Sequence, residues 1–253
     1  LREQLAIAIQ DEVQQSLNRF LEADSLEMLR RTQILESLEY RLYPEYLQKA
    51  AELLGPDDAA YQIILAKSQY FTAVNQRIEG LVQKEQDLSF LKEAKKLLLQ
   101  AQLELPLAAY IEYELGLIER NLNHPGNALR HFKEAARFSP TWALPQEAIG
   151  SLMLQRSRQA SAESLTAQLE EIEAVVGVAI ENDPTYFGNY LVQGQAQEEL
   201  GHWLEAELSY RDALMRILLS SRPFDALGYL YLKMGDFDLA NEMFYEADLR
   251  RGL

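Results

Sequence analysis

The side chains best suited to chemistry are few in this sequence and lie far apart. It has three histidines, His124, His131 and His202, and no cysteine. A helix offers two imidazoles to one zinc ion when they are four residues apart, whereas His124 and His131 are seven apart. We therefore interpret the histidines as surface residues and predict that the chain holds no metal.

Carboxylates are abundant but form no catalytic pattern. The runs Glu170-Glu171-Glu173 and Glu198-Glu199 are typical of solvated helix faces, because nothing around them indicates burial. The sequence also lacks a glycine-rich phosphate loop, a nucleophile elbow and an HExxH motif. We predict a non-catalytic chain without a cofactor, so any enzymatic role would belong to a domain outside this sequence.

Charge limits the classes of partner. The 253 residues carry a formal net charge of −15, which opposes binding to nucleic acid phosphates and to anionic membranes. We expect a protein or peptide partner that is neutral or basic, and no apolar run is long enough to span a membrane. The chain begins Leu-Arg-Glu without Met, so we interpret it as a piece of a longer or processed protein, soluble and either cytoplasmic or periplasmic.

The elements that would position any site follow from a regular spacing of prolines and small residues. A proline precedes a small residue by ten positions in the pairs Pro56 and Ala66, Pro106 and Gly116, Pro140 and Gly150, and Pro184 and Gly194; Leu218 replaces the proline before Gly228. A second pattern sets a small residue four before a larger one and seven before an alanine, as in Ala128, Phe132 and Ala135, or Ala206, Tyr210 and Ala213. Small residues at such intervals indicate close crossings of paired helices.

The last unit carries the fullest pattern, Phe224-x2-Leu227-Gly228-x2-Tyr231 followed by Ala240-x3-Phe244-x2-Ala247. It resembles a tetratricopeptide (TPR) motif, a helix–turn–helix repeat of 34 residues. The break between its two helices falls at Gly235-Asp236. The resemblance implies an all-α fold, a right-handed α-solenoid of antiparallel helix hairpins with about five repeats. We expect an N-terminal helical cap or degenerate repeat at 1–56 and TPR-like repeats at 57–106, 107–140, 141–184, 185–218 and 219–253.

The N-terminal region fits the repeat pattern poorly. Leu5, Ile9, Val13, Leu17 and Phe20 predict one apolar side of a helix over 1–21. Asp24 and Glu27 have N-cap chemistry, so we expect a second helix near Ser25. We place Pro44 in the first turn of a third helix that ends at Gly55-Pro56.

Two repeats are longer than the others. About sixteen extra residues around 76–92 and about ten near 156–165 lie between the two helices of their hairpins. Their Gln, Glu, Lys and Leu content favours longer helices with displaced turns over open loops. Such extensions are either contact surfaces or longer hairpins with no role of their own.

A groove is implied by the resemblance, because the first helix of each TPR repeat lines the concave side. The inward residues would include Tyr70, Tyr110, Tyr113, Leu117, Arg120, Glu147, Leu191, Gln195, Glu198, Glu199 and Tyr229. Tyrosines make good anchors there, since they bury much area at little entropic cost; alternatively, they pack against the next repeat. The Lys, Asn and Arg clamp of chaperone-binding TPR proteins is missing.

We therefore predict a protein–protein interaction scaffold that binds a peptide or partner protein in this groove. The alternative is a structural or oligomerisation module that assembles through open solenoid ends and extended hairpins, or a regulatory domain of a larger protein. No further helix covers the last repeat within the sequence, so Met234, Phe237, Phe244 and Tyr245 would be partly uncovered, and a homo-oligomer could form there.

Overall fold

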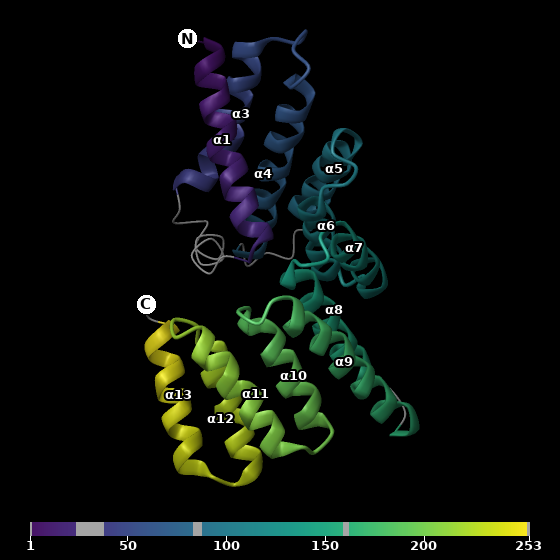
Figure 1. The fold of residues 1–253 in the computed structure, drawn as a ribbon, viewed down its shortest axis with the longest axis vertical. Coiled ribbons are helices and arrows are strands. Elements are labelled where there is room, and N and C mark those ends of the chain that lie inside the picture. The colour runs from purple at the N-terminus through teal and green to yellow at the C-terminus, as the bar shows by residue number, and fades with distance from the viewer. Residues whose placement is uncertain (1, 24–37, 83–87, 159–161, 252–253) are drawn as a thin grey trace. The chain divides into compact units, whose positions relative to one another are not determined.

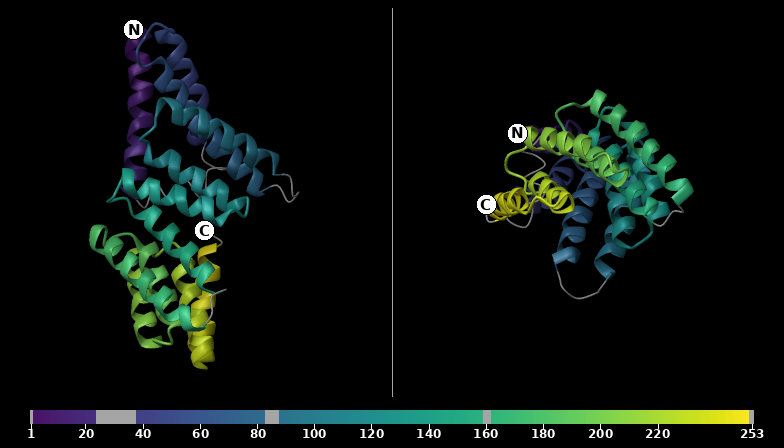
Figure 2. Two further views of the ribbon diagram at one scale, coloured as in Figure 1. Left: turned by 90° about the vertical axis from the view of Figure 1, so that its right-hand side faces the viewer. Right: turned by 90° about the horizontal axis from the view of Figure 1, so that it is seen from below.

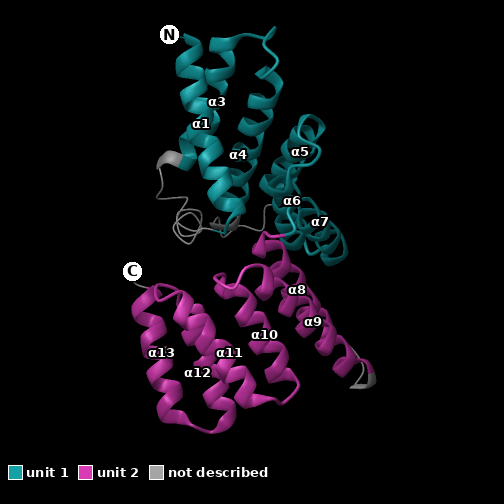
Figure 3. Ribbon diagram, viewed as in Figure 1, with its two compact units in different colours: residues 1–140 teal, residues 141–253 magenta. Residues whose placement is uncertain are grey.

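The computed structural model describes residues 2–23, 38–82, 88–158 and 162–251, and these residues form twelve α-helices and no strand (Figure 1). Two compact units divide the chain, residues 1–140 and residues 141–253 (Figure 3). The helices of the first unit are α1 (Arg2–Leu21), α3 (Leu38–Leu54), α4 (Tyr61–Val82), α5 (Ser89–Glu104), α6 (Ala109–Asn121) and α7 (Pro125–Phe138). Those of the second are α8 (Ala143–Ser157), α9 (Ala162–Asn182), α10 (Phe187–Glu199), α11 (Trp203–Arg216), α12 (Arg222–Met234) and α13 (Phe237–Arg251). The predicted all-α class is confirmed.

Consecutive helices pair as hairpins, α4 with α5, α6 with α7, α8 with α9, α10 with α11 and α12 with α13. The crossings depend on the predicted small residues. A Cβ atom added at Gly194 would overlap a ring carbon of Tyr210, and one at Gly228 would lie 2.7 Å from Phe244. No real Cβ tolerates such an approach, so only glycine lets these helices come this close.

In three of the hairpins, a turn of the same geometry connects the two helices. Asn123, Gly201 and Gly235 adopt left-handed φ values of 60°, 79° and 82°. The amide after each of them donates to a carbonyl five residues earlier, as from Asp236 to Tyr231 at 2.9 Å. This helix ending satisfies carbonyls that the helix itself leaves unpaired. The predicted break at Gly235 is therefore confirmed.

The two long repeats contain the two longest hairpin helices. α4 has 22 residues and α9 has 21, whereas α6, α10 and α12 have 13 each (Figure 2). The expected lengthening of helices is confirmed for these two. Residues 83–87 and 159–161, where the displaced turns were expected, lie outside the described residues.

The N-terminal region departs from prediction in two places. Leu5 is exposed because α1 turns Ala6 inward at its start, whereas Val13, Leu17 and Phe20 are buried as predicted. Pro44 lies inside α3, which begins earlier than expected. A proline leaves the carbonyl four residues before it without its helical donor, and Asn75 Nδ2 donates to that Tyr40 carbonyl at 3.4 Å. The helix predicted near Ser25 lies outside the described residues.

Candidate functional site

The first helices of the three hairpins in the second unit, α8, α10 and α12, carry a chain of ion pairs that we call the inner face. On α8, Glu147 binds Arg222 Nη2 of α12 at 2.6 Å and accepts the hydroxyl hydrogen of Tyr186. A Cβ at Gly188 would lie 2.6 Å from Glu147 Oε2. Glycine at the start of α10 therefore leaves room for this carboxylate.

Glu198 and Glu199 at the end of α10 are paired in the same way. Glu198 binds Lys233 Nζ at 2.5 Å and accepts a hydrogen bond from Tyr210 at 2.6 Å. Burial, together with the bond to Glu198, raises the pKa of Tyr210, so its hydroxyl stays a donor. Glu199 binds Arg158 Nε at 3.1 Å. Each predicted acidic residue of the groove thus has a cation from another first helix or its end.

The inner face is therefore electrically balanced. The Lys233 side chain is 56% exposed and that of Glu198 is 11% exposed, so the cation is more accessible to solvent than its counterion. Arg222 and Arg158 are likewise more exposed than Glu147 and Glu199. Arg158 was not among the residues predicted for the groove. Arg222 and Lys233 occupy inward positions of the last repeat in the TPR pattern, and they lie on the same side of their helix as the predicted Tyr229.

The remaining candidates of the second unit differ in accessibility. Leu191 is buried in the core, and Gln195 is half-buried. Tyr229 is exposed, with the edge of its ring against Phe244 at 5.1 Å between centroids. Helical spacing puts Tyr229 between Arg222 and Lys233 along α12. It is the accessible aromatic side chain of the inner face.

In the first unit, the predicted tyrosines pack mainly against one another. Tyr70 is buried, and its ring meets that of Tyr110 edge-on at 4.8 Å. Tyr110 is buried too, which raises the pKa of its hydroxyl. Contact with the next repeat was the alternative interpretation of these residues, and neither offers free surface to a partner.

Tyr113 occupies a more open position on α6. Its ring meets Phe20 of α1 at 6.0 Å and Phe132 of α7 at 5.4 Å, and the side chain remains half-buried. One turn further along α6, Leu117 is half-buried and Arg120 is exposed. These three residues form the accessible part of the predicted groove in this unit.

Three glutamates of α6 are buried, which the sequence did not indicate. Glu112 accepts from His131 Nδ1 at 2.6 Å, and Glu114 pairs with Arg77. Glu119 binds Lys95 Nζ at 2.7 Å. The prediction that all histidines are surface residues is wrong for His131, which is buried because α7 turns it toward Glu112 on α6.

Glu112 and His131 are groups that could exchange a proton, but both are buried and cannot be reached from solvent. His131 Nε2 lies 2.9 Å from an Arg130 nitrogen, and Gln102 occupies the other oxygen of Glu112. Both ends of the imidazole are occupied and the pair is buried, so it forms a polar link between α6 and α7. Among the described residues no group of three or more His, Asp or Glu side chains is arranged to hold a metal ion.

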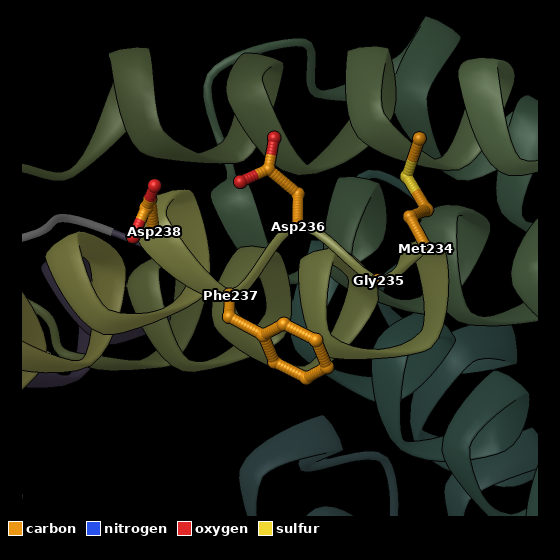
Figure 4. A pocket seen from close by; sticks show the side chains of 5 residues that line it. All are labelled: Met234, Gly235, Asp236, Phe237 and Asp238. Atoms are coloured by element: carbon orange, nitrogen blue, oxygen red, sulfur yellow. The ribbon is translucent and has the colours of Figure 1, made fainter.

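A shallow hollow lies at the turn between α12 and α13, lined by Met234, Gly235, Asp236, Phe237 and Asp238 (Figure 4). The Phe237 ring points away from the side chains of Met234 and Asp236. Asp236 Oδ1 accepts from the Leu239 amide at 3.1 Å, which caps α13. Met234, Phe237, Phe244 and Tyr245 are all exposed or half-buried, as predicted for the last hairpin.

Comparison with solved structures identifies the architecture. A thermophilic TPR protein from Thermus thermophilus, TTC0263, superposes with a TM-score of 0.62 at 23% identity, covering 72% of this chain and 89% of that one. MamA from Desulfovibrio magneticus RS-1 (residues 41 to its end) gives 0.52 at 15% identity, covering 78% and 97%. The chain has a TPR-type fold. No protein-family model and no curated protein sequence matches the chain. The solved structures alone therefore confirm the predicted resemblance to TPR proteins, and they confirm it at the level of fold. No helix in the described ranges of this TPR-type chain has the length and apolarity needed to cross a membrane.

Proposed function

We propose that the chain is a non-catalytic scaffold that holds an extended segment of a protein partner on the first helices of its hairpins. The observation that carries this proposal is the exposed Tyr229 between two anchored cations, Arg222 and Lys233, on α12. An aromatic ring flanked by hydrogen-bond donors suits a peptide, whose backbone carbonyls accept from cations while a side chain packs on the ring. The TPR-type fold supports the same class of function.

Pre-ordering makes this face suitable for a weakly structured partner. Each cation is held by a carboxylate that is less exposed than itself, so less side-chain freedom is lost when a peptide binds. The same pairing removes the free negative charge expected of the groove. We therefore propose a neutral segment for the inner face, with Tyr113, Leu117 and Arg120 as a second contact surface in the first unit.

A displayed library of random peptides, selected on the full chain, tests the proposal. Tyr229→Ser should weaken the enriched peptides by about thirtyfold, the loss typical of a central aromatic anchor. Tyr245→Ser is the matched control, because Tyr245 on α13 is 64% exposed and Tyr229 is 61% exposed. Failure to enrich any peptide, or equal losses in the two variants, would refute the proposed role of the inner face.

An oligomerisation module is the second candidate, favoured by the apolar side chains at the last hairpin. Met234, Phe237 and Tyr245 are exposed around the turn and the outer side of α13. Sedimentation of the full chain over a range of concentrations separates the two functions. Dimers that dissociate in Phe237→Ser/Tyr245→Ser but persist in Tyr229→Ser would favour assembly, whereas a monomer at all concentrations would exclude it.

A further inference from the structure

A row of exposed apolar side chains runs along α11. Leu204, Leu208 and Met215 are 68%, 65% and 79% exposed. Spacings of four and seven residues place the three on one stripe of the helix. The stripe lies opposite Ala206 and Ala213, which are fully buried against the rest of the hairpin. We call these three residues the outer row; Leu218 and Leu219, which follow the helix in the sequence, are also exposed.

The fold does not require apolar residues at these positions. The buried alanines Ala128 of α7 and Ala206 of α11 are equivalent, which aligns the two helices residue by residue. The aligned outer positions of α7 are Gly126, Arg130, Lys133 and Arg137, all of them exposed. A glycine and three water-facing cations thus occupy the same places in another hairpin. Exposed apolar side chains at three of these positions on α11 therefore indicate a contact rather than a packing need.

Exposed carboxylates lie at aligned positions of the hairpins on either side of the outer row. α10 contacts α9 and α11 contacts α12, so the α10–α11 hairpin lies between α8–α9 and α12–α13. Of the four aligned outer positions, α9 carries exposed Glu170 and Glu181 with Ala174 and Gly177 between them, and α13 carries exposed Asp238 and Glu242 followed by exposed Tyr245 and Leu249. Within the row itself the cation is Arg211, which is committed to Glu207 at 2.8 Å and to the Tyr231 hydroxyl at 2.8 Å.

We propose that the outer row binds an amphipathic helix of a protein partner, with an apolar stripe on Leu204, Leu208 and Met215 and lysines or arginines along both borders. Those cations would face the carboxylates of α9 and α13. The charge selects this occupant over two others. A second copy would bring the same carboxylates together, and an anionic lipid surface would be repelled by them. This surface is separate from the inner face, so it does not depend on the peptide site proposed there.

Two synthetic helical peptides test the assignment, one with a leucine stripe bordered by lysines and one with the same stripe bordered by glutamates. Titrated into the full chain, the lysine peptide should bind, bind more weakly as salt is added, and lose at least about tenfold in affinity in Leu208→Gln/Met215→Gln. Leu103→Gln, which changes a comparably exposed leucine on α5, should bind as the wild type does. Unchanged melting temperatures confirm that all variants are folded.

Equal binding of the glutamate peptide, or undiminished binding of the lysine peptide to the double variant, would overturn the proposal. So would evidence for either competing occupant: dimers in sedimentation, or co-sedimentation with zwitterionic phospholipid vesicles, that Leu208→Gln/Met215→Gln abolishes. Tyr229→Ser should leave the lysine peptide bound. The outcome for the outer row is therefore independent of the outcome for the inner face.

Discussion

A Cβ atom placed on Gly116 of α6 would lie 2.5 Å from Cε1 of Phe132 on α7. Phe132 is fully buried, so its ring has no space into which to move. The glycine and the aromatic ring are sixteen residues apart, and Gly194 with Tyr210 and Gly228 with Phe244 repeat both the spacing and the contact. In each of these hairpins, the contact between the glycine backbone and the aromatic ring sets how closely the two helices cross.

Gly116→Ala should therefore destabilise the first unit. Alanine gains about 1 kcal/mol of helix propensity over glycine, but overpacking a full core costs about 1–3 kcal/mol. We expect a net loss of up to about 2 kcal/mol in the free energy of unfolding, measured by urea denaturation. Gly177→Ala in α9 is the control, because nothing lies within 4 Å of its added Cβ. That variant should be more stable by about 0.5–1 kcal/mol, and a loss of similar size in both would contradict the steric argument.

Phe132 and Phe244 occupy equivalent places but should contribute unequally. Phe132→Ala should cost about 3–5 kcal/mol, as is usual for a buried phenylalanine. Phe244→Ala should cost less, because Phe244 is only half-buried in the last hairpin and its ring borders exposed Tyr229. Chemical denaturation of both variants measures the difference, and a larger loss for Phe244→Ala would mean that the last hairpin is covered in solution.

The sequence could predict these crossings because they depend on residues within one hairpin. Gly228, Ala240 and Phe244 recur at fixed intervals, and each contact is local to its repeat. Periodicity also marked where helices lengthen, since the extra residues around 76–92 and 156–165 are helix-forming. The spacing and size of residues therefore predict how a residue packs within its own pair of helices.

The ion pairs could not be predicted in the same way. Glu147 and Arg222 are 75 residues apart, and Glu198 and Lys233 are 35 apart. The stacking of successive hairpins decides which long charged side chains meet. The sequence contains many other charged residues that could form such pairs equally well. Burial of His131 also escaped prediction, because its partner Glu112 is one of three glutamates that α6 buries among apolar residues. Solvent exposure of polar residues is an average tendency, and these pairs are exceptions allowed by complementary partners.

Acid should weaken the fold through Glu119. Burial opposes its ionisation, but hydrogen bonds from Lys95, His124 and Asn127 outweigh burial and hold its pKa below the ordinary 4.5. A carboxylate with a lowered pKa in the folded state contributes stability that is present above about pH 4.5 and lost as the pH falls through the folded-state pKa. Glu119→Gln should therefore be less stable than the wild type at pH 7, with a gap that narrows as the pH falls below about 4.5. Unfolding free energies from about pH 3 to 7 measure the gap, and a constant gap would exclude this contribution.

Asn189 of α10 is the clearest place where the chain should gain stability. It is fully buried, and neither its Oδ1 nor its Nδ2 has a hydrogen-bond partner in the part of the chain that the structure describes. A buried amide without partners costs about 1–3 kcal/mol. Asn189→Leu replaces it by an apolar side chain with the same branching and should raise the free energy of unfolding by about 1 kcal/mol, measured by thermal and urea denaturation. Ser157→Ala is the contrast, because the Ser157 hydroxyl donates to the Leu154 carbonyl at 2.9 Å and its removal should not stabilise. If Asn189→Leu instead destabilised the protein, the amide would be bound to something in solution, such as a buried water.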